Sequence, residues 1–343
     1  MVAPHMITIA YLTNRKETMI EWFFNSLHRE IAGRTDGIQL IVVDYWCQEL
    51  DVSHIETKRV EDRRTEFKKK SLIPFKHTPP KPSVWQGPHR LTKSDFFAPS
   101  NARNTALCFA EGEYIVFVDD LSVLMPGWFQ EVEAAVKLGV VACGSYAKAL
   151  EMSVVSGELR KVKGMRASLS MLTSDAVVEH LLKYHPQGVD SRLSQVNGWE
   201  PAAASGSWMF GCSCAMPVTA LLEIEGFDED CDPMGGEDYC CGMLLHRLGL
   251  KFQYRKRMMT VESEELHSQG VPFKRPIKDA NTANDASLRM LKWVQSGARR
   301  KGANYWGRGG LRVLRDKVLN GSPLPVIGIP EHDWRDSQPL REM

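Results

Sequence analysis

The segment Asn101–Gly127 reads NARNTALCFAEGEYIVFVDDLSVLMPG and holds the most informative pattern in the chain. Residues 102–110 are mostly small and apolar, which predicts a helix that ends at Glu-Gly-Glu. The continuous β-branched and aromatic run Tyr114–Val118 predicts a strand that is buried on both faces. Two adjacent carboxylates, Asp119 and Asp120, follow that strand directly, so the segment predicts an acidic tip at the end of a buried strand.

Helices are predicted on both sides of this strand. Ser100 is placed as the possible N-cap of the first helix. The second helix begins near Pro126 and has apolar residues at helical spacing until Gly139 stops it. In open α/β sheets ligands bind beyond the carboxyl ends of the strands, so the two aspartates are expected to face a crevice. Because Asp is also a common turn residue, a structural role for this pair stays open.

The composition is that of an ordinary globular protein. With 343 residues and 43% hydrophobic content, the chain can bury a sizeable core. Its 43 Lys and Arg nearly cancel its 42 Asp and Glu, and the net charge of +1 gives no sign of a general affinity for nucleic acid or anionic membranes. No apolar run has the length of a membrane span and no signal segment opens the chain, so we expect a cytoplasmic protein. The eight cysteines are expected to be reduced and mostly buried.

The N-terminal segment predicts a parallel βαβ unit. The apolar run Ile7–Leu12 predicts the first strand, and apolar residues at helical spacing predict an amphipathic helix over Glu17–Ile31. The run Leu40–Val43 predicts a second buried strand, which finishes on Asp44. A right-handed crossover would make the two strands parallel. We therefore expect Asp44 and Asp119 to lie at the carboxyl ends of neighbouring parallel strands.

Residues 56–98 form a distinct segment, which is charged in its first part and rich in proline in its second. This composition predicts an inserted, irregular loop. The loop is either a solvated surface connection or a lid that closes over a bound ligand, because long ordered loops are often lids. In the second case Trp85 and Lys93 are the residues expected to contact the ligand.

Two further stretches predict a pocket and a helix beside it. Residues 202–216 are small, apolar and glycine-containing, which suits close backbone approach near a pocket, and Trp208 stands out among them. A polar loop with several glycines then leads into a helix that a further glycine closes. Glu237 and Asp238 lie in the first turn of this helix, where the helix dipole stabilises their ionised forms.

The order of these features resembles that of the GT-A glycosyltransferases, especially the inverting family 2 group and its β-1,4-galactosyltransferase-like relatives. The resemblance extends from Ile7 to His267. No G-x-G-x-x-G follows the first strand and no G-x-x-x-x-G-K-[ST] is present, so the folds that bind nucleotides through those loops are not indicated. The matching pieces are Thr13-Asn14-Arg15, Asp44, Ala102-Arg103-Asn104, Asp119-Asp120, Pro126-Gly127-Trp128, and Gly226-Phe227-Asp228 leading to Gly235-Gly236-Glu237-Asp238.

The resemblance implies a single α/β domain of GT-A type, which is Rossmann-like with a mixed, mainly parallel central sheet flanked by helices. The catalytic domain would cover residues 1–290. Within it, residues 7–145 would form the nucleotide-sugar half and residues 146–290 the acceptor half, with the loop over 56–98 inserted in the first. Residues 291–343 would form a basic C-terminal extension.

The resemblance also implies an inverting, metal-dependent glycosyltransferase. Such an enzyme moves a sugar from a nucleotide diphosphate sugar, with a UDP-sugar favoured, to the hydroxyl of a glycan or small molecule. A divalent cation, Mn²⁺ or Mg²⁺, would neutralise the diphosphate leaving group and needs hard oxygen ligands. Asp119 would supply one, and His267 is a candidate second ligand. The usual D-x-D signature is incomplete here, because Leu121 occupies its third position.

The remaining roles follow from the same resemblance. Asp238 would be the general base that takes the acceptor's proton, and Glu237 would orient the acceptor. A purely structural role stays open for several of these residues: an acidic pair at a helix N-terminus, an ion pair for Arg103, core packing for Trp208 and a surface or core position for His267. The expected nucleotide-sugar-binding residues are Thr13, Arg15, Asp44, Lys93, Arg103, Asp120 and Trp208.

Two other functions compete with this one. A catalytically degenerate protein could hold nucleotide sugars without turnover, and Leu121 favours that hypothesis. Alternatively, the enzyme could modify a hydroxylated base in DNA, which the basic tail and the charged segment would favour. The near-zero net charge argues against a duplex binder.

Overall fold

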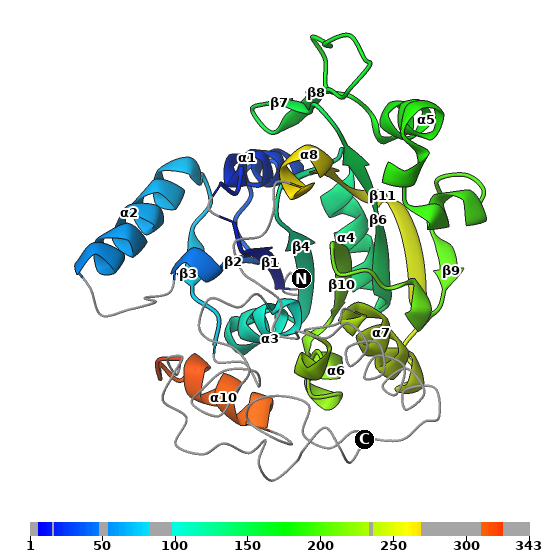
Figure 1. The fold of residues 1–343 in the computed structure, drawn as a ribbon. Helices are drawn as coiled ribbons and strands as arrows, with labels where there is room; N and C mark the ends of the chain where they lie inside the picture. The colour runs from blue at the N-terminus through cyan, green and yellow to red at the C-terminus, as the bar shows by residue number, and fades with distance from the viewer. Residues whose placement is uncertain are drawn as a thin grey trace, which may run out of the picture.

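The computed structural model describes residues 6–15, 17–47, 54–81, 98–232, 236–268 and 310–324 (Figure 1). The elements of the first part are β1 (Ile7–Thr13), α1 (Ile20–Glu30), β2 (Ile38–Asp44), α2 (His54–Lys70), β3 (Phe75–Thr78), α3 (Pro99–Phe109), β4 (Tyr114–Asp119), β5 (Ser122–Leu124), α4 (Trp128–Leu138) and β6 (Val141–Ala149). Those of the second part are β7 (Ser153–Val155), β8 (Glu158–Lys161), α5 (Ser174–Tyr184), β9 (Ala202–Ala204), the short 3₁₀ helix η4 (Gly206–Trp208), β10 (Ser213–Pro217), α6 (Val218–Glu223), α7 (Glu237–Arg247), β11 (Phe252–Ser263), α8 (Glu264–Ser268) and α10 (Gly310–Leu319).

A central sheet organises the described part of the chain. Its strands follow the order β3-β2-β1-β4-β10-β6-β11-β5, and β9 pairs with β11. Strands β3, β2, β1, β4, β6 and β11 run in one direction, whereas β10, β5 and β9 run in the other. The mixed, mainly parallel α/β sheet predicted from the sequence is therefore confirmed. Strand β10, which comes from the second part of the chain, pairs between β4 and β6.

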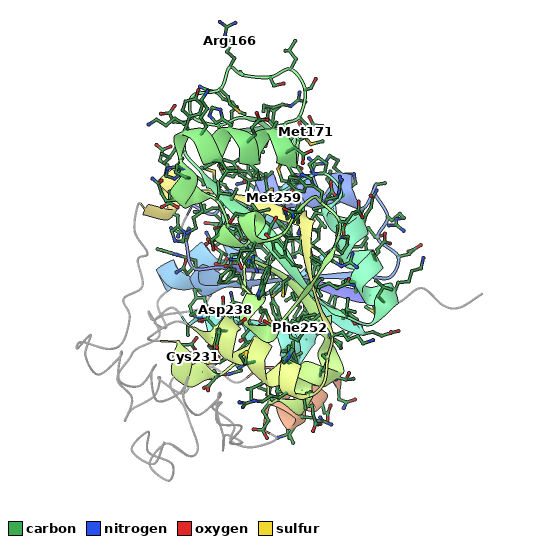
Figure 2. All side chains as sticks on the ribbon, turned by 90° about the vertical axis from the view of Figure 1, so that its right-hand side faces the viewer. Arg166, Met171, Cys231, Asp238, Phe252 and Met259 are labelled. Atoms are coloured by element: carbon green, nitrogen blue, oxygen red, sulfur yellow. The ribbon has the colours of Figure 1, made fainter. Side chains whose placement is uncertain are left out.

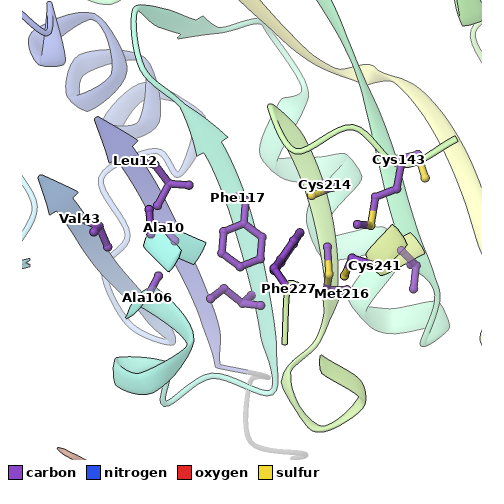
Figure 3. Packing of buried hydrophobic residues seen from close by; sticks show 14 of the residues in the cluster. Ala10, Leu12, Val43, Ala106, Phe117, Cys143, Cys214, Met216, Phe227 and Cys241 are labelled. Atoms are coloured by element: carbon purple, nitrogen blue, oxygen red, sulfur yellow. The ribbon is translucent and has the colours of Figure 1, made fainter. Parts of the chain in front are cut away.

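Helices cover both faces of this sheet and give the protein two hydrophobic layers. On one face α1 and α4 bury Phe23, Phe24 and Trp128 against the strands. On the other face α3, α6, α7 and α10 lie toward the bottom of Figure 1. There Phe117 of β4 meets Phe227 edge-on, with 5.3 Å between ring centroids (Figure 3). The eight cysteines are all free and, apart from the half-buried Cys212, buried, as the sequence predicted.

The helices α1 and α3 each begin at a different residue than the sequence predicted. The first helix begins at Ile20 rather than Glu17, after Met19 in the left-handed conformation. Ser100 is not the N-cap of α3, because the helix already begins at Pro99 and Ala98 occupies the cap position. The Asp232 carboxylate takes over the capping role, accepting hydrogen bonds from the Ser100 amide at 2.5 Å and the Asn101 amide at 3.3 Å. The loop before α7 is thereby fastened to the start of α3.

The expectation that residues 56–98 form an irregular loop is wrong for its first part. The charged stretch is the helix α2, and the edge strand β3 follows it. Two apolar residues seven positions apart, Val60 and Phe67, are buried and hold α2 to the molecule. Most of the charged side chains over 61–70 are exposed, and Arg63 is an exception. Residues 82–97 lie outside the described residues, as do Trp85 and Lys93.

Asp44 and Asp119 do lie at the carboxyl ends of parallel strands at one edge of the sheet, but these strands are not neighbours. Strand β1 lies between them, pairing Thr13 with Asp44 on one side and Leu12 with Asp119 on the other. The first strand of the chain is thus in the middle of the parallel part of the sheet, which the linear order of the sequence does not reveal.

The C-terminal part is described only over α10 and the residues just after it. Leu311, Leu314 and Val318 bury one face of α10, which contacts α3. Arg315 donates a hydrogen bond to the Ala110 carbonyl at 2.7 Å. The predicted boundary at residue 290 falls outside the described residues, so the proposed division into 1–290 and 291–343 stays a prediction. No helix in the described ranges is long and apolar enough to cross a membrane.

Candidate active site

The acidic tip is held by a tight turn between β4 and β5. Leu121 in this turn has a φ of 59°, a left-handed conformation that costs a bulky residue about 1–3 kcal/mol. Its amide donates to the Tyr11 hydroxyl at 3.3 Å, and the Ser122 hydroxyl donates to the Asp119 carbonyl at 2.6 Å. The Leu121 side chain is buried in the core. The third position of the incomplete D-x-D signature therefore offers no ligand to the crevice.

Asp120 is held by the first strand. Its carboxylate accepts hydrogen bonds from the Thr13 hydroxyl at 2.9 Å and from Arg15 Nε at 3.2 Å. Burial raises the pKa of Asp120, while Arg15 and Thr13 oppose that shift. The structure thus brings Thr13, Arg15 and Asp120 together, and their polar groups bind one another.

Arg15 also contacts His267 of α8, which is about 250 residues later in the sequence. Arg15 Nη2 lies 3.1 Å from His267 Nδ1, and since guanidinium can only donate, Nδ1 is the acceptor. Burial, followed by Lys148 and Arg15, lowers the pKa of His267, so the ring is neutral and its other nitrogen carries the proton. In this arrangement His267 is close to the acidic tip but could bind a cation only if the contact with Arg15 were exchanged.

Arg103 joins the acidic tip to the start of α7. Its guanidinium donates to Glu237 Oε1 at 2.8 Å and to Asp119 Oδ1 at 3.3 Å. Although burial favours loss of the charge, Asp119, Glu237 and Asp238 raise the pKa of Arg103 above its ordinary value. Gly211 lies against the guanidinium, and a Cβ there would be 2.0 Å from Arg103 Nη2. The structure therefore brings Asp119, Arg103 and the acidic pair of α7 into one network.

Asp238 projects from the first turn of α7 (Figure 2). Its two oxygens accept hydrogen bonds from the Gly211 amide at 3.2 Å and from its neighbour Tyr239's amide at 2.7 Å. Burial and the adjacent Glu237 raise the pKa of Asp238 to about 6, against the lowering effect of Arg103 and the two amides. A carboxylate with a pKa near neutral is suited to accept a proton at physiological pH.

Asp44 differs from the other predicted site residues because its oxygens already have partners. The carboxylate has no exposed surface and accepts from Arg63 Nε at 2.5 Å, from Arg63 Nη2 at 3.0 Å and from the Trp46 amide at 2.9 Å. His77 Nε2 lies 3.0 Å away. Burial alone would raise the pKa of Asp44, but His77 and Arg63 outweigh it and lower the pKa. Direct contact with a nucleotide would require one of these partners to be displaced.

We expect the substitution Asp44→Ala to lower the free energy of unfolding by about 3–5 kcal/mol, because it leaves the mostly buried Arg63 without its two bonds to Asp44. Since folding lowers the pKa of Asp44, its contribution is present above the usual carboxyl pKa of about 4 and is lost as the pH falls. Urea unfolding at pH 7 and at pH 3.5 measures both effects. The exposed Asp36→Ala is the matched control, with an expected change within about 0.5 kcal/mol. A stable Asp44→Ala protein would contradict the structural role.

Trp208 lies on η4, which packs against α7. A Cβ on Gly206 would be 2.2 Å from the Gly242 carbonyl oxygen, so two glycines allow this loop and helix to approach closely. The half-buried Trp208 meets Tyr254 edge-on at 5.4 Å between ring centroids. The residue is thus on the loop beside the helix that carries Glu237 and Asp238, where both sugar stacking and packing stay open.

One buried acid near the site has no counterpart in the sequence analysis. Glu262 on β11 is 6% exposed, and its Oε1 atom is inaccessible and accepts no hydrogen bond within the described part of the chain. Burial and the nearby Asp119 raise the pKa of Glu262 to about 8, which Lys148 partly opposes. The signal in the sequence is an acid that directly follows the mainly apolar run Met258–Val261, at a position where a buried strand normally has an apolar or small residue.

The residues at the tip are suited to a divalent cation, although not as a complete cage. In the described ranges no three His, Cys, Asp or Glu side chains form a ready metal site. Asp119 has a side chain that is 40% exposed, and Glu262 has a buried oxygen without a partner. Carboxylate oxygens are the ligands that Mg²⁺ and Mn²⁺ prefer. These residues fit a cation whose other ligands come from a diphosphate and water.

Comparison of the sequence with known protein families and with curated proteins finds no match. Comparison with solved structures finds similar chains at low identity. A structure of GalNAc-T7 with UDP, GalNAc and Mn²⁺ is 13% identical and aligns over 84% of this chain and 48% of the other, with a TM-score of 0.49. TarS 1–349 of S. aureus is 13% identical, over 75% and 60%, with a TM-score of 0.43.

A mannosyltransferase from Pyrobaculum calidifontis, PcManGT, in complex with GDP-Man and Mn²⁺, is 15% identical over 94% of this chain and 78% of the other, with a TM-score of 0.41. The chain spans about half the length of the GalNAc-T7 chain. The superpositions are too loose to carry a conclusion on activity, donor or cofactor, which has to come from the residues of this chain.

Proposed function

We propose that this protein is an inverting, metal-dependent glycosyltransferase that moves a sugar from a nucleotide diphosphate sugar to an acceptor hydroxyl, with Asp238 as the general base. The observation that carries the proposal is the network in which Arg103 joins Asp119 at the strand tip to Glu237 beside Asp238. This network combines an exposed carboxylate for a cation with a carboxylate whose pKa is about 6. Inverting transfer needs these two groups, one for the leaving diphosphate and one for the acceptor.

The proposed reaction is a single displacement. The acceptor hydroxyl gives its proton to Asp238, and its oxygen forms the new bond to the anomeric carbon of the sugar. The bond from that carbon to the diphosphate oxygen breaks, and its electron pair leaves with the diphosphate. Attack from the face opposite the leaving group inverts the configuration.

Several residues of the chain would assist this step. Arg103 donates a hydrogen bond to Glu237 and holds it in place, so that Glu237 can orient the acceptor. Asp119, with Glu262 or His267 as further candidates, would hold a divalent cation, which when bound neutralises the negative charge of the diphosphate. Thr13, Arg15 and Asp120, which hydrogen-bond to one another, would contact the nucleotide sugar. Lys93 and Trp208 stay proposals for contacts to the donor.

The pH dependence of the reaction tests the assignment of the base. Since only ionised Asp238 can accept a proton, kcat/KM should rise with pH through an apparent pKa of about 6. The substitution Glu237→Gln removes a negative charge that raises the pKa of Asp238, while Arg103 continues to lower that pKa. We therefore expect the acid limb of the Glu237→Gln profile to move to lower pH. A limb that keeps its position would contradict a base at Asp238.

The activity itself is tested with a panel of UDP-, GDP-, CDP- and dTDP-sugars, each with Mn²⁺ and with chelator. Thermal shift measures binding, because a ligand of the native state raises apparent stability by mass action. Donor hydrolysis in the same samples measures turnover. Binding with turnover supports the enzyme, binding without turnover supports the degenerate binder, and no Mn²⁺-dependent binding to any member of the panel contradicts the proposal.

A further inference from the structure

The starting point is the unusual environment of Glu262. A carboxyl group that leaves water without a hydrogen-bond partner costs free energy, so buried acids normally have partners. Glu262 is 6% exposed, and its Oε1 atom has no partner in the part of the chain that the structure describes. The fold maintains this group at a cost, and a bound ligand would offset that cost.

The position of Glu262 is fixed by the sheet. It is opposite Ser122 of β5 on one side and Lys148 of β6 on the other. The next residue, Ser263, donates its amide to the Leu121 carbonyl at 3.1 Å, so the end of β11 is fastened directly to the turn that carries the acidic tip. Glu262 is therefore adjacent in space to Asp119, although it is far away in the sequence.

The charges around Glu262 are mostly negative. Asp119, Asp120 and Glu264 all act to keep the group neutral, and Lys148 is the cation that opposes them. Lys148 also lies 3.8 Å from Glu264 and is shared between the two acids. A bound divalent cation would place more positive charge beside these acids than one shared lysine does, and would favour the ionised form of Glu262.

We propose that Glu262 is a ligand of the divalent cation that binds beside Asp119, and that it supplies the second carboxylate of this site. The inference rests on the proposed function, since it concerns the same cation. Leu121, which faces the core, offers no oxygen there, and His267 is engaged by Arg15. Among the described residues Glu262 has a buried Oε1 atom that accepts no hydrogen bond, and β11 places it on the side of β4 opposite β1.

The test measures Mn²⁺ affinity by electron paramagnetic resonance of the free ion, with Mn²⁺ alone and with UDP, GDP, CDP and dTDP in separate titrations. Glu262→Gln keeps the size of the side chain and removes the charge. We expect it to weaken Mn²⁺ binding about 10-fold or more, the scale found when groups of a metal site are removed. Glu262→Asp, which keeps the carboxylate on a shorter stem, should lose less.

The matched control is Glu264→Gln, which removes the same charge two residues further along, from a side chain that is 34% exposed. If Glu262 acted only through long-range charge, both variants would weaken binding equally, and that result would overturn the proposal. So would an affinity of Glu262→Gln within about twofold of wild type. Wild-type protein that binds no Mn²⁺, or Asp119→Ala that binds it normally, would instead contradict the proposed function.

Thermal unfolding without metal gives a second readout. Because the buried carboxyl group lacks a partner, the apolar Glu262→Leu should raise the melting temperature of the metal-free protein, whereas a structural role would make it fall. Mn²⁺ should raise the melting temperature of the wild type more than that of Glu262→Gln. A metal-free variant that is less stable than wild type and keeps the full Mn²⁺ shift would show a structural residue and overturn the proposal.

Discussion

The substitution Asp238→Asn should lower turnover by about 10² to 10⁴-fold, the usual contribution of a general base, while donor binding survives. Asparagine has nearly the size of aspartate but cannot accept the acceptor's proton. Its carbonyl oxygen can replace one of the two oxygens that accept from the Gly211 and Tyr239 amides. Arg103 and Glu237 keep their bond to each other, so the network around the donor stays in place. Steady-state kinetics at pH 7.5 and donor titration by thermal shift measure the two effects.

The alternative for Asp238 is an acidic residue that only stabilises the start of α7. In that case the substitution would change activity little, since asparagine is also well tolerated at helix starts. Asp175→Asn is the matched control, because Asp175 is an exposed acid in the first turn of α5. Activity of Asp238→Asn close to that of Asp175→Asn would reject the catalytic role, and Glu237→Gln would then be the next variant to assay.

Replacing Asp119 by alanine is expected to abolish metal-dependent binding of the nucleotide diphosphate and to leave the fold intact. The side chain is 40% exposed, and the structure gives it one ion pair, at 3.3 Å to Arg103, which retains its bond to Glu237. Loss of the carboxylate therefore removes little stability but takes away the most accessible ligand at the tip.

The Asp119→Ala prediction is measured by thermal shift with Mn²⁺ and each nucleotide. At about 100 times Kd the wild type should gain about 2.7 kcal/mol of apparent stability from its ligand, and the variant should gain none. Far-ultraviolet circular dichroism and the urea midpoint serve as checks that the variant is folded. A variant with the full Mn²⁺-dependent shift would exclude Asp119 from the cation site.

Periodicity in the sequence was sufficient to predict the strands whose carboxyl ends carry the candidate site. The apolar runs at β1, β2 and β4 and the helical spacing in α4 correspond to elements of the structure, with boundaries that moved by a few residues. Such runs are reliable because each one is buried on both faces or along one stripe, and the pattern records that burial directly. Carboxylates at strand ends were predicted for the same reason.

Other features depend on which segments become neighbours, and no local pattern records that. The helix α2 has a low apolar content, and it packs on the molecule through tertiary contacts such as those of Val60 and Phe67. Asp44 was assigned to nucleotide contact from the resemblance, and its partners Arg63 and His77 were not predicted because they come from α2 and β3, whose positions were unknown. Glu262 was not predicted as a site residue because its burial results from pairing with β5 and β6 on either side.

The position of β10 between β4 and β6 has a consequence for the order in which the chain can fold. A nascent chain synthesised only as far as β6 would have the edges of β4 and β6 without the strand that joins them. Unpaired edges of this kind are prone to pair with other chains, and the contacts that remove them span a long stretch of sequence. The sheet can therefore close only after Ser213–Pro217 has been synthesised, and the surroundings of Asp119 are completed by the later part of the chain that also carries Asp238.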